Sequence, residues 1–430
     1  MMEKLTAFVQ EHMGDDLTRL VLDRKKWPDI DIDLAVSCIQ SRRKLKGKVQ
    51  EWFSNPSLIF PAGLSAEQCS STATAVYKAR LAARIAGPEK AAGIGVHGEV
   101  TGWRLADLTG GLGVDSWMFS KGAAEVLYNE MQENLCMAAA NNFVALEADN
   151  IMISNRMAAP ETIDEILEGF DADIVYMDPA RRGEGGKKVF LIEECTPDVL
   201  TLKDIIFARC RHILLKLSPM ADITMVCDRL GSTCRQVHVV ATGGECKELL
   251  IWMDREWSGE YEIIAAELAS GYPDSKAFTF SFKMSEEKNS QLALLGRNDS
   301  LTPAAESQRF LFEPGKALMK AGCYNLLSDR FGLLKLGRST HYYITEDPAK
   351  ADMLKQLGKV YEIIDCQPLD KRTMKAAGRD YPHAEVTARN IPMDTDTFRK
   401  KMGVSSGDDA HIFGLKSDTL GNLLIITRRI

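Results

Sequence analysis

Residues 103–115, WRLADLTGGLGVD, decide the fold of this chain. An apolar segment runs into the glycine-rich turn TGGLG at 109–113, and a helical pattern follows it. This order predicts a strand that ends in a tight turn, where missing side chains let the backbone approach a bound molecule. Two further predicted strands end in acids, Glu130 and Asp178. Because the carboxyl ends of parallel strands share one edge of a sheet, we expect both acids beside the turn.

The charges around this turn favour one kind of ligand. Asp107 precedes the first glycine by three residues and would repel the pyrophosphate of a dinucleotide, whereas S-adenosylmethionine has no phosphate and carries an ammonium and a sulfonium. Glu130 can accept both ribose hydroxyls, although a nicotinamide cofactor would use the same acid. Asn155 stands where an acid often holds the adenine amine, and its amide oxygen could make that bond. The predicted cofactor residues are Asp107, Thr109, Gly110, Gly111, Gly113, Asp115, Glu130, Asn155 and Asp178.

With these residues the chain resembles the class I S-adenosylmethionine-dependent methyltransferases, and more closely the bacterial members with a C-terminal THUMP-like domain. The likeness extends along nearly all of the chain, through LSAEQCSSTATAVYKARL at 64–81, LLKLSPMADI at 214–223 and FEPGKALMKAG at 312–322. It implies a seven-stranded sheet of order 3-2-1-4-5-7-6 and an RNA substrate.

The pattern of segments predicts several domains, as a length of 430 residues requires. The first part reads as helical, with Ser65 and Gln68 forming a capping box that opens a helix ended by Gly87. Strands and helices then alternate, and two strands joined only by Gly243 and Gly244 predict a terminal antiparallel hairpin. We expect an α/β fold with a Rossmann-like methyltransferase sheet, organised as a helical domain at 1–95, a cofactor-binding domain at 96–255, a small α+β ferredoxin-like domain at 256–330 and a THUMP-like RNA-binding domain at 331–430.

The DPARR segment at 178–182 is predicted to carry the chemistry. In the resembling enzymes the acid at this position faces the acceptor base, and methyl transfer depends mainly on alignment. The carboxylate could also take up the released proton. Where related amino methyltransferases place an aromatic residue, this chain has arginines, whose planes stack on bases and bind phosphate. The predicted catalytic residues are Asp178, Pro179 and Arg181, and the predicted substrate contacts are Arg181, Arg182, Lys187 and Lys216.

Composition limits the class of protein. The chain has no apolar run near ~18 residues and no secretory signal, and its ten cysteines form no CxxC pair. We therefore expect a cytoplasmic protein with reduced thiols, no metal and no membrane span. The net charge of −7 does not favour RNA, but a basic cluster at 399–401 and another around Arg181 could contact phosphate.

The sequence thus predicts a methyltransferase that uses S-adenosylmethionine and modifies a base in tRNA or rRNA. A non-catalytic RNA-binding protein with a vestigial cofactor pocket and an NAD-dependent oxidoreductase remain alternatives, and so does a protein or small-molecule methyltransferase. The target nucleotide, the methylated atom and the oligomeric state stay open.

Overall fold

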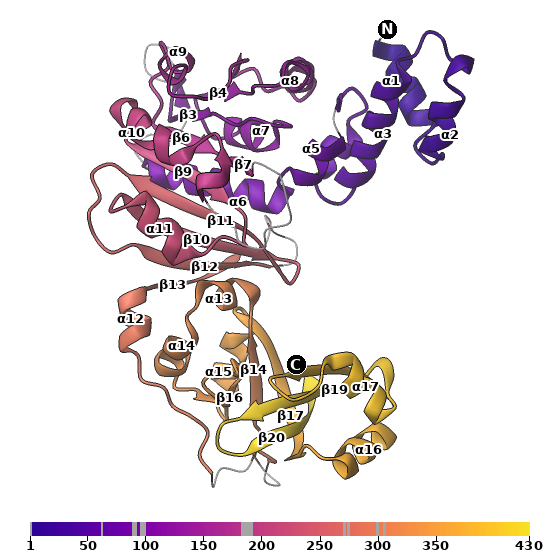
Figure 1. Ribbon diagram of the computed structural model, residues 1–430, viewed down its shortest axis with the longest axis vertical. Helices are drawn as coiled ribbons and strands as arrows, with labels where there is room; N and C mark the ends of the chain where they lie inside the picture. The colour runs from indigo at the N-terminus through magenta and orange to yellow at the C-terminus, as the bar shows by residue number, and fades with distance from the viewer. Residues whose placement is uncertain are drawn as a thin grey trace. The chain divides into compact units, whose positions relative to one another are not determined.

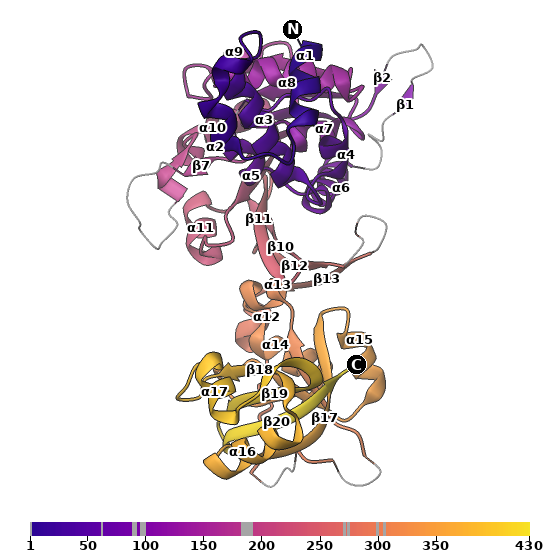
Figure 2. The same ribbon diagram turned by 90° about the vertical axis from the view of Figure 1, so that its right-hand side faces the viewer.

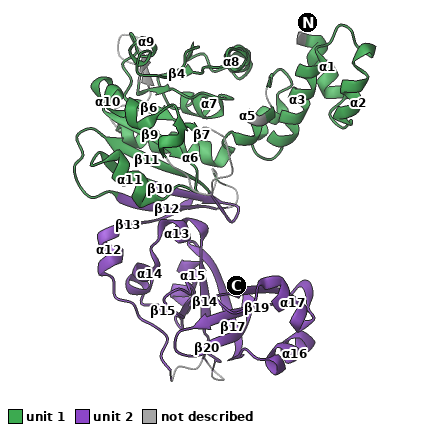
Figure 3. Ribbon diagram, in the orientation of Figure 1, with its two compact units in different colours: residues 1–237, 247–261, 271–275 green, residues 238–246, 262–270, 276–430 purple. Residues whose placement is uncertain are grey.

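The computed structural model divides into two compact units (Figure 3). Unit 1 comprises residues 1–237, 247–261 and 271–275, and unit 2 comprises residues 238–246, 262–270 and 276–430. The residues described are 2–61, 63–87, 93–94, 100–181, 192–269, 272, 276–297, 301–303 and 307–430.

Unit 1 begins with helices, as the sequence predicts (Figure 1). They are α1 (Met2–Glu11), α2 (Leu17–Leu22), α3 (Ile32–Leu45), α4 (Gln50–Ser54), α5 (Gly63–Gln68) and α6 (Thr72–Ala86), with a 3-10 turn at Arg24–Lys26. The expected single helix from Ser65 is wrong, because the chain breaks between α5 and α6. The hydroxyl of Ser71 instead caps α6 by accepting from the backbone N–H of Thr74. Trp52 packs edge-on against Trp117, so these helices share a core with the sheet domain.

The central sheet of unit 1 has the predicted order. In sequence its strands are β3 (Arg104–Asp107), β4 (Glu125–Asn129), β5 (Ile151–Ser154), β6 (Ile174–Met177), β9 (His212–Leu217), β10 (Cys234–Thr242) and β11 (Glu245–Asp254). In space they run β5-β4-β3-β6-β9-β11-β10, which is the order 3-2-1-4-5-7-6. The first five strands are parallel and β11 is antiparallel to β9, so the terminal hairpin is confirmed (Figure 2).

Short elements complete unit 1. The helices are α7 (Val114–Ser120), α8 (Glu133–Ala145), α9 (Ile163–Ile166), α10 (Val199–Arg209) and α11 (Ile223–Leu230), with a 3-10 turn at Ile192–Glu194. Two small antiparallel pairs join β1 (Gly93–Ile94) to β2 (Val100–Thr101) and β7 (Ala180–Arg181) to β8 (Cys195–Thr196). The β7–β8 pair holds the backbone that directly follows Asp178.

In unit 2 the order continues from the end of β10 through β12 (Glu262–Leu268) to β13 (Ala277–Lys283), which makes nine strands rather than the seven that the resemblance implies. A second sheet has the order β15-β16-β14-β17-β20-β19-β18. Its strands are β14 (Phe310–Pro314), β15 (Leu334–Lys335), β16 (Tyr343–Thr345), β17 (Gly358–Pro368), β18 (His383–Arg389), β19 (Ser405–Ser417) and β20 (Gly421–Arg429). The helices are α12 (Met284–Asn289), α13 (Lys316–Ala321), α14 (Tyr324–Phe331), α15 (Pro348–Leu354), α16 (Lys371–Asp380) and α17 (Thr395–Met402).

Within the described ranges, no helix combines the length and the apolar character that crossing a bilayer requires.

Candidate functional site

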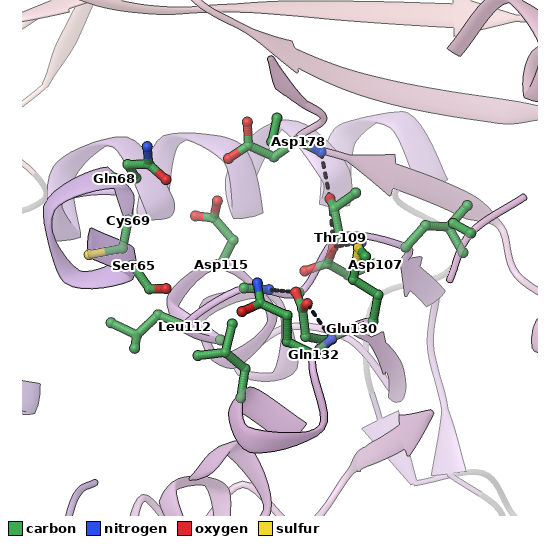
Figure 4. Close-up of a pocket in the computed structure, with 18 of the residues that line it drawn as sticks. Ser65, Gln68, Cys69, Asp107, Thr109, Leu112, Asp115, Glu130, Gln132 and Asp178 are labelled. Atoms are coloured by element: carbon green, nitrogen blue, oxygen red, sulfur yellow. Dashed lines mark hydrogen bonds between the residues drawn. The ribbon is translucent and has the colours of Figure 1, made fainter. Parts of the chain in front are cut away.

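A cavity opens in unit 1 at the carboxyl ends of β3, β4 and β6. The glycine turn, Glu130 and Asp178 line it, as the sequence predicts for this edge of the sheet. The opposite wall comes from α5 and the residue after it, through Ser65, Gln68 and Cys69, which sequence reasoning did not select (Figure 4). The N-terminal helices therefore form part of the cavity.

The glycine turn is closely packed, which explains its composition. A β-carbon on Gly110 would lie 2.1 Å from the ring of Tyr128, and Gly113 has a φ of +92°, which disfavours other residues. The Tyr128 hydroxyl donates to the carbonyl of Gly111 at 2.7 Å, and the N–H of Gly110 donates to the carbonyl of Asn129 at 2.8 Å. The turn is thus fixed against β4.

Glu130 has both carboxylate oxygens held by backbone N–H groups. Its Oε2 accepts from the N–H of Gly111 and its Oε1 from the N–H of Gln132, each at 2.9 Å. Each oxygen keeps a second lone pair, so the carboxylate can still accept a pair of ribose hydroxyls. Asn155 is exposed and lies outside the cavity lining, and its side-chain N–H donates to the carbonyl of Glu130 at 2.7 Å.

Two more carboxylates lie at the turn in different environments. Asp107 is 1% exposed and accepts from the hydroxyl of Ser116 at 2.6 Å and from the N–H of Thr109 at 3.0 Å. Burial raises the pKa of Asp107 to about 7, despite these hydrogen bonds. Asp115 Oδ2 accepts from the hydroxyls of Ser70 and Tyr176, each at 2.9 Å.

Asp115 is also held ionised by a lysine. Its Oδ1 is buried, makes no hydrogen bond within the described residues and forms an ion pair with the ammonium of Lys78 at 3.3 Å. Burial raises the pKa of Asp115, but Lys78 and Lys216 outweigh it and hold the pKa below its usual value. An ionised carboxylate in the cavity lining fits the ammonium of S-adenosylmethionine and does not fit a diphosphate.

Asp178 sits where the third strand of the motif ends. Its N–H donates to the hydroxyl of Thr109 at 2.6 Å, which joins the end of β6 to the glycine turn. Its carboxylate forms an ion pair with Lys216 at the end of β9, and Pro179 is buried. Lys216 itself does not line the cavity.

The remaining predicted substrate contacts have less structural support. Arg181 lies in β7, and only its backbone is described. Arg182 and Lys187 lie outside the described residues. The structure therefore brings together the cofactor residues except Asn155, and it adds Lys216 behind Asp178.

Sequence reasoning missed Lys78 and Glu248, which lie behind the cavity. The ammonium of Lys78 is 3.0 Å from both oxygens of Glu248 and 2.8 Å from the hydroxyl of Ser70. Their signal was a charge inside an apolar pattern, in AVYKARLA of α6 and in ELLIW of β11. Among the described residues, no group of three or more His, Cys, Asp or Glu has a metal-binding arrangement.

Comparisons with known proteins agree with this architecture. Residues 310–351 match the model of a ferredoxin-like domain, and residues 358–429 match a THUMP domain-like family. A protein from Porphyromonas gingivalis W83, described as a candidate methyltransferase, has the same fold over 100% of this chain and 98% of its own, with 25% identity and a TM-score of 0.81. No curated protein matches the chain.

Two other solved structures are much less similar to this chain. An rRNA methylase from Streptococcus thermophilus is 11% identical, with a TM-score of 0.30 over 41% of this chain and 94% of its own. The human methyltransferase 10 domain containing protein is 13% identical, with a TM-score of 0.32 over 53% and 99%. The sheet order and the full-length likeness confirm the expected α/β class I methyltransferase fold, and the domain match confirms a THUMP-like C-terminal region.

Proposed function

We propose that this protein is a cytoplasmic S-adenosylmethionine-dependent methyltransferase that modifies RNA. The observation that carries the proposal is the set of carboxylates around the glycine turn, with Glu130 hydrogen-bonded to the turn and Asp107, Asp115 and Asp178 lining the same cavity. Anions arranged in this way attract a cation and repel a diphosphate. The NAD-dependent alternative has no such support.

Each group of residues has a proposed role. Glu130 holds the ribose of the cofactor, and Asp107 and Asp115 face its positive charges, while the cofactor supplies the methyl group. Thr109 and the three glycines shape the turn, and Asn155 would meet the adenine only by turning from the Glu130 carbonyl. Asp178 and Pro179 present the acceptor, and the arginines and lysine at 181, 182 and 187 contact the substrate.

The RNA substrate is supported by the C-terminal region. Residues 358–429 match a THUMP domain-like family, and such domains bind RNA in the family that the sequence resembles. The last turn of α17 adds Arg399, Lys400 and Lys401, of which both lysines are exposed.

The boundaries between domains at 95, 255 and 330 remain proposals. All ten cysteines are free, as a reducing cytoplasm requires.

Isothermal titration with S-adenosylmethionine tests the cofactor. The intact protein should bind it, and Glu130→Gln should weaken binding about tenfold by removing charge that the ribose hydroxyls face. Glu125→Gln makes the same change at the other end of β4, where Glu125 pairs with Arg104 at the surface, and should leave the affinity unchanged. No binding by the intact protein would refute the proposal.

Methyl transfer from labelled S-adenosylmethionine to total cellular RNA tests the activity. We expect label in RNA and none after Asp178→Ala. Retention of RNA without incorporation would instead support the non-catalytic alternative.

A further inference from the structure

Behind the acceptor side of the cavity lies a network of charges that a cofactor site alone does not require. Lys216 pairs with Asp178, and Lys78 pairs with Glu248 at 3.0 Å and with Asp115 at 3.3 Å. The five side chains come from five elements, α6, α7, β9, β11 and the end of β6. We call them the lysine–carboxylate network.

Exposure within the network increases toward the cavity. The side chain of Lys78 is fully buried, that of Glu248 is 3% exposed, that of Lys216 is 13% exposed and that of Asp178 is 37% exposed. Asp178 is therefore the end of the network that meets a substrate. Buried ion pairs are costly for stability, and clusters of them gather at functional sites.

The carboxylates keep Lys216 charged. Burial lowers the pKa of Lys216, but Asp178, Glu248 and Asp115 outweigh burial and raise it above its usual value. The cavity thus has a carboxylate at its acceptor wall with a permanent ammonium directly behind it. This pairing has a different effect on each class of acceptor.

An amine or ring nitrogen gains positive charge as it attacks a methyl group, so a nearby ammonium opposes its reaction. A hydroxyl must lose its proton, and negative charge develops on its oxygen, so the same ammonium favours its reaction. A carboxylate beside that ammonium can accept the hydroxyl proton. The network therefore favours a hydroxyl over a nitrogen.

A ring carbon is a third class of acceptor, and it usually requires a thiolate nucleophile. Cys69 lines the cavity, but its thiol donates to the carbonyl of Ala66 at 3.3 Å. Burial raises the pKa of Cys69, so the thiol stays protonated. The cavity offers no activated cysteine among its described residues.

We infer that the methyl acceptor is a ribose hydroxyl of RNA, held by Asp178 in front of the Lys216 ammonium. The inference rests on the proposed function and replaces the base that the sequence suggested as acceptor. The 2′-hydroxyl is the hydroxyl present at every RNA nucleotide. Asp178 is the catalytic residue, whereas Lys216, Lys78 and Glu248 are positioning residues that act through it.

The chemical step balances with these groups alone. The hydroxyl oxygen forms the bond to the methyl carbon as the carbon–sulfur bond breaks and leaves its electron pair on sulfur. The hydroxyl proton passes to the Asp178 carboxylate and then to water. The products are a methyl ether, a neutral thioether and a solvated proton.

The position of the methyl group tests the inference without any variant. RNA from cells that lack the gene is incubated with the protein and methyl-labelled S-adenosylmethionine, and then hydrolysed with alkali. A 2′-O-methyl group blocks cleavage of the adjacent phosphodiester, so we expect label in alkali-resistant dinucleotides. Label in mononucleotides would mark a base and overturn the inference while leaving the proposed function intact. No label together with no cofactor binding would overturn both.

Variants of Lys216 test the network. Lys216→Met should lower kcat at least 100-fold, on the order expected for losing one electrostatic contact in an active site, with KM changed only a few-fold. Lys216→Arg keeps the charge and should recover part of the activity. The control Lys203→Met removes a lysine of α10 that donates to the Leu230 carbonyl, and should have no effect on kcat. A Lys216→Met enzyme with near-normal kcat would refute the role of the network.

Discussion

Among the described residues, each unit contains one fully buried lysine, and the two have different surroundings. Lys78 in unit 1 faces the carboxylates of Glu248 and Asp115. Lys335 in unit 2 donates to the carbonyl of Arg338 at 3.1 Å and to the amide oxygen of Asn325 at 3.4 Å. It also lies within 6 Å of the ring centroids of Tyr324 and Tyr343. The two lysines are equally buried, but carboxylates compensate the lost hydration of Lys78, whereas neutral oxygens and aromatic rings contact Lys335.

The surroundings of a buried lysine decide the direction in which its pKa shifts. Burial lowers the pKa of Lys335, which carbonyls and rings compensate poorly, and also lowers that of the neighbouring His341 to about 4. In unit 1 the carboxylates raise the pKa of Lys216 instead. Carboxylates thus favour the charged form of Lys216 in unit 1, whereas burial disfavours the charged form of Lys335 in unit 2.

Removing Lys78 should have the largest effect. Lys78→Met leaves Glu248 buried without its hydrogen-bonded cation, so we expect the free energy of unfolding to fall by about 3–5 kcal/mol. Urea denaturation measures this loss. The double variant Lys78→Met/Glu248→Met removes both charges and should recover most of it. A double variant as unstable as the single one would show that the pairing is not what matters.

Asp107 is a buried carboxylate that contrasts with Glu248 and Asp115, because no lysine pairs with it in the described structure. With a pKa of about 7, it is mostly protonated at pH 6 and mostly ionised at pH 8. A cationic cofactor should therefore bind about tenfold more tightly at pH 8, equal to about 1.4 kcal/mol. Isothermal titration at both pH values measures the ratio. The Asp107→Asn protein controls for any pH dependence that comes from the amino group of the cofactor. The same ratio of affinities at pH 8 and pH 6 in both proteins would contradict the prediction.

Lys335 should give the smallest effect. Lys335→Met should leave the free energy of unfolding at pH 7 unchanged or raise it by about 1 kcal/mol, since it removes a poorly compensated charge. Folding lowers the pKa of Lys335, so the free energy of unfolding of the wild-type protein rises with pH until the pH reaches the pKa that this lysine has in the unfolded chain. The Lys335→Met protein should therefore lose its advantage in stability near pH 10. Thermal unfolding at pH 7 and pH 10 tests this. The exposed control Lys316→Met should shift stability by less than about 0.5 kcal/mol.

The features that the sequence predicted correctly are those that a short stretch of residues specifies. The glycine turn, the acids after β4 and β6 and the two-glycine hairpin can each be recognised within a few residues, whereas the sheet order came from the family resemblance. The start of one helix was predicted wrongly, because Ser65 lies within the short helix α5 and Ser71 caps α6 instead. Lys78 and Glu248 could not be paired from sequence, because neither has a local partner and both interrupt an apolar pattern.

The ion pair between Lys78 and Glu248 joins positions 170 residues apart. During synthesis α6 leaves the ribosome long before β11 exists, and closing so long a loop carries an entropic cost until the strand arrives. The ammonium of Lys78 must stay hydrated through that interval. A chain interrupted before β11 would already contain the glycine turn, Asp178 and both lysines of the network yet lack Glu248, so Lys78 would be without the carboxylate that holds it in the finished fold.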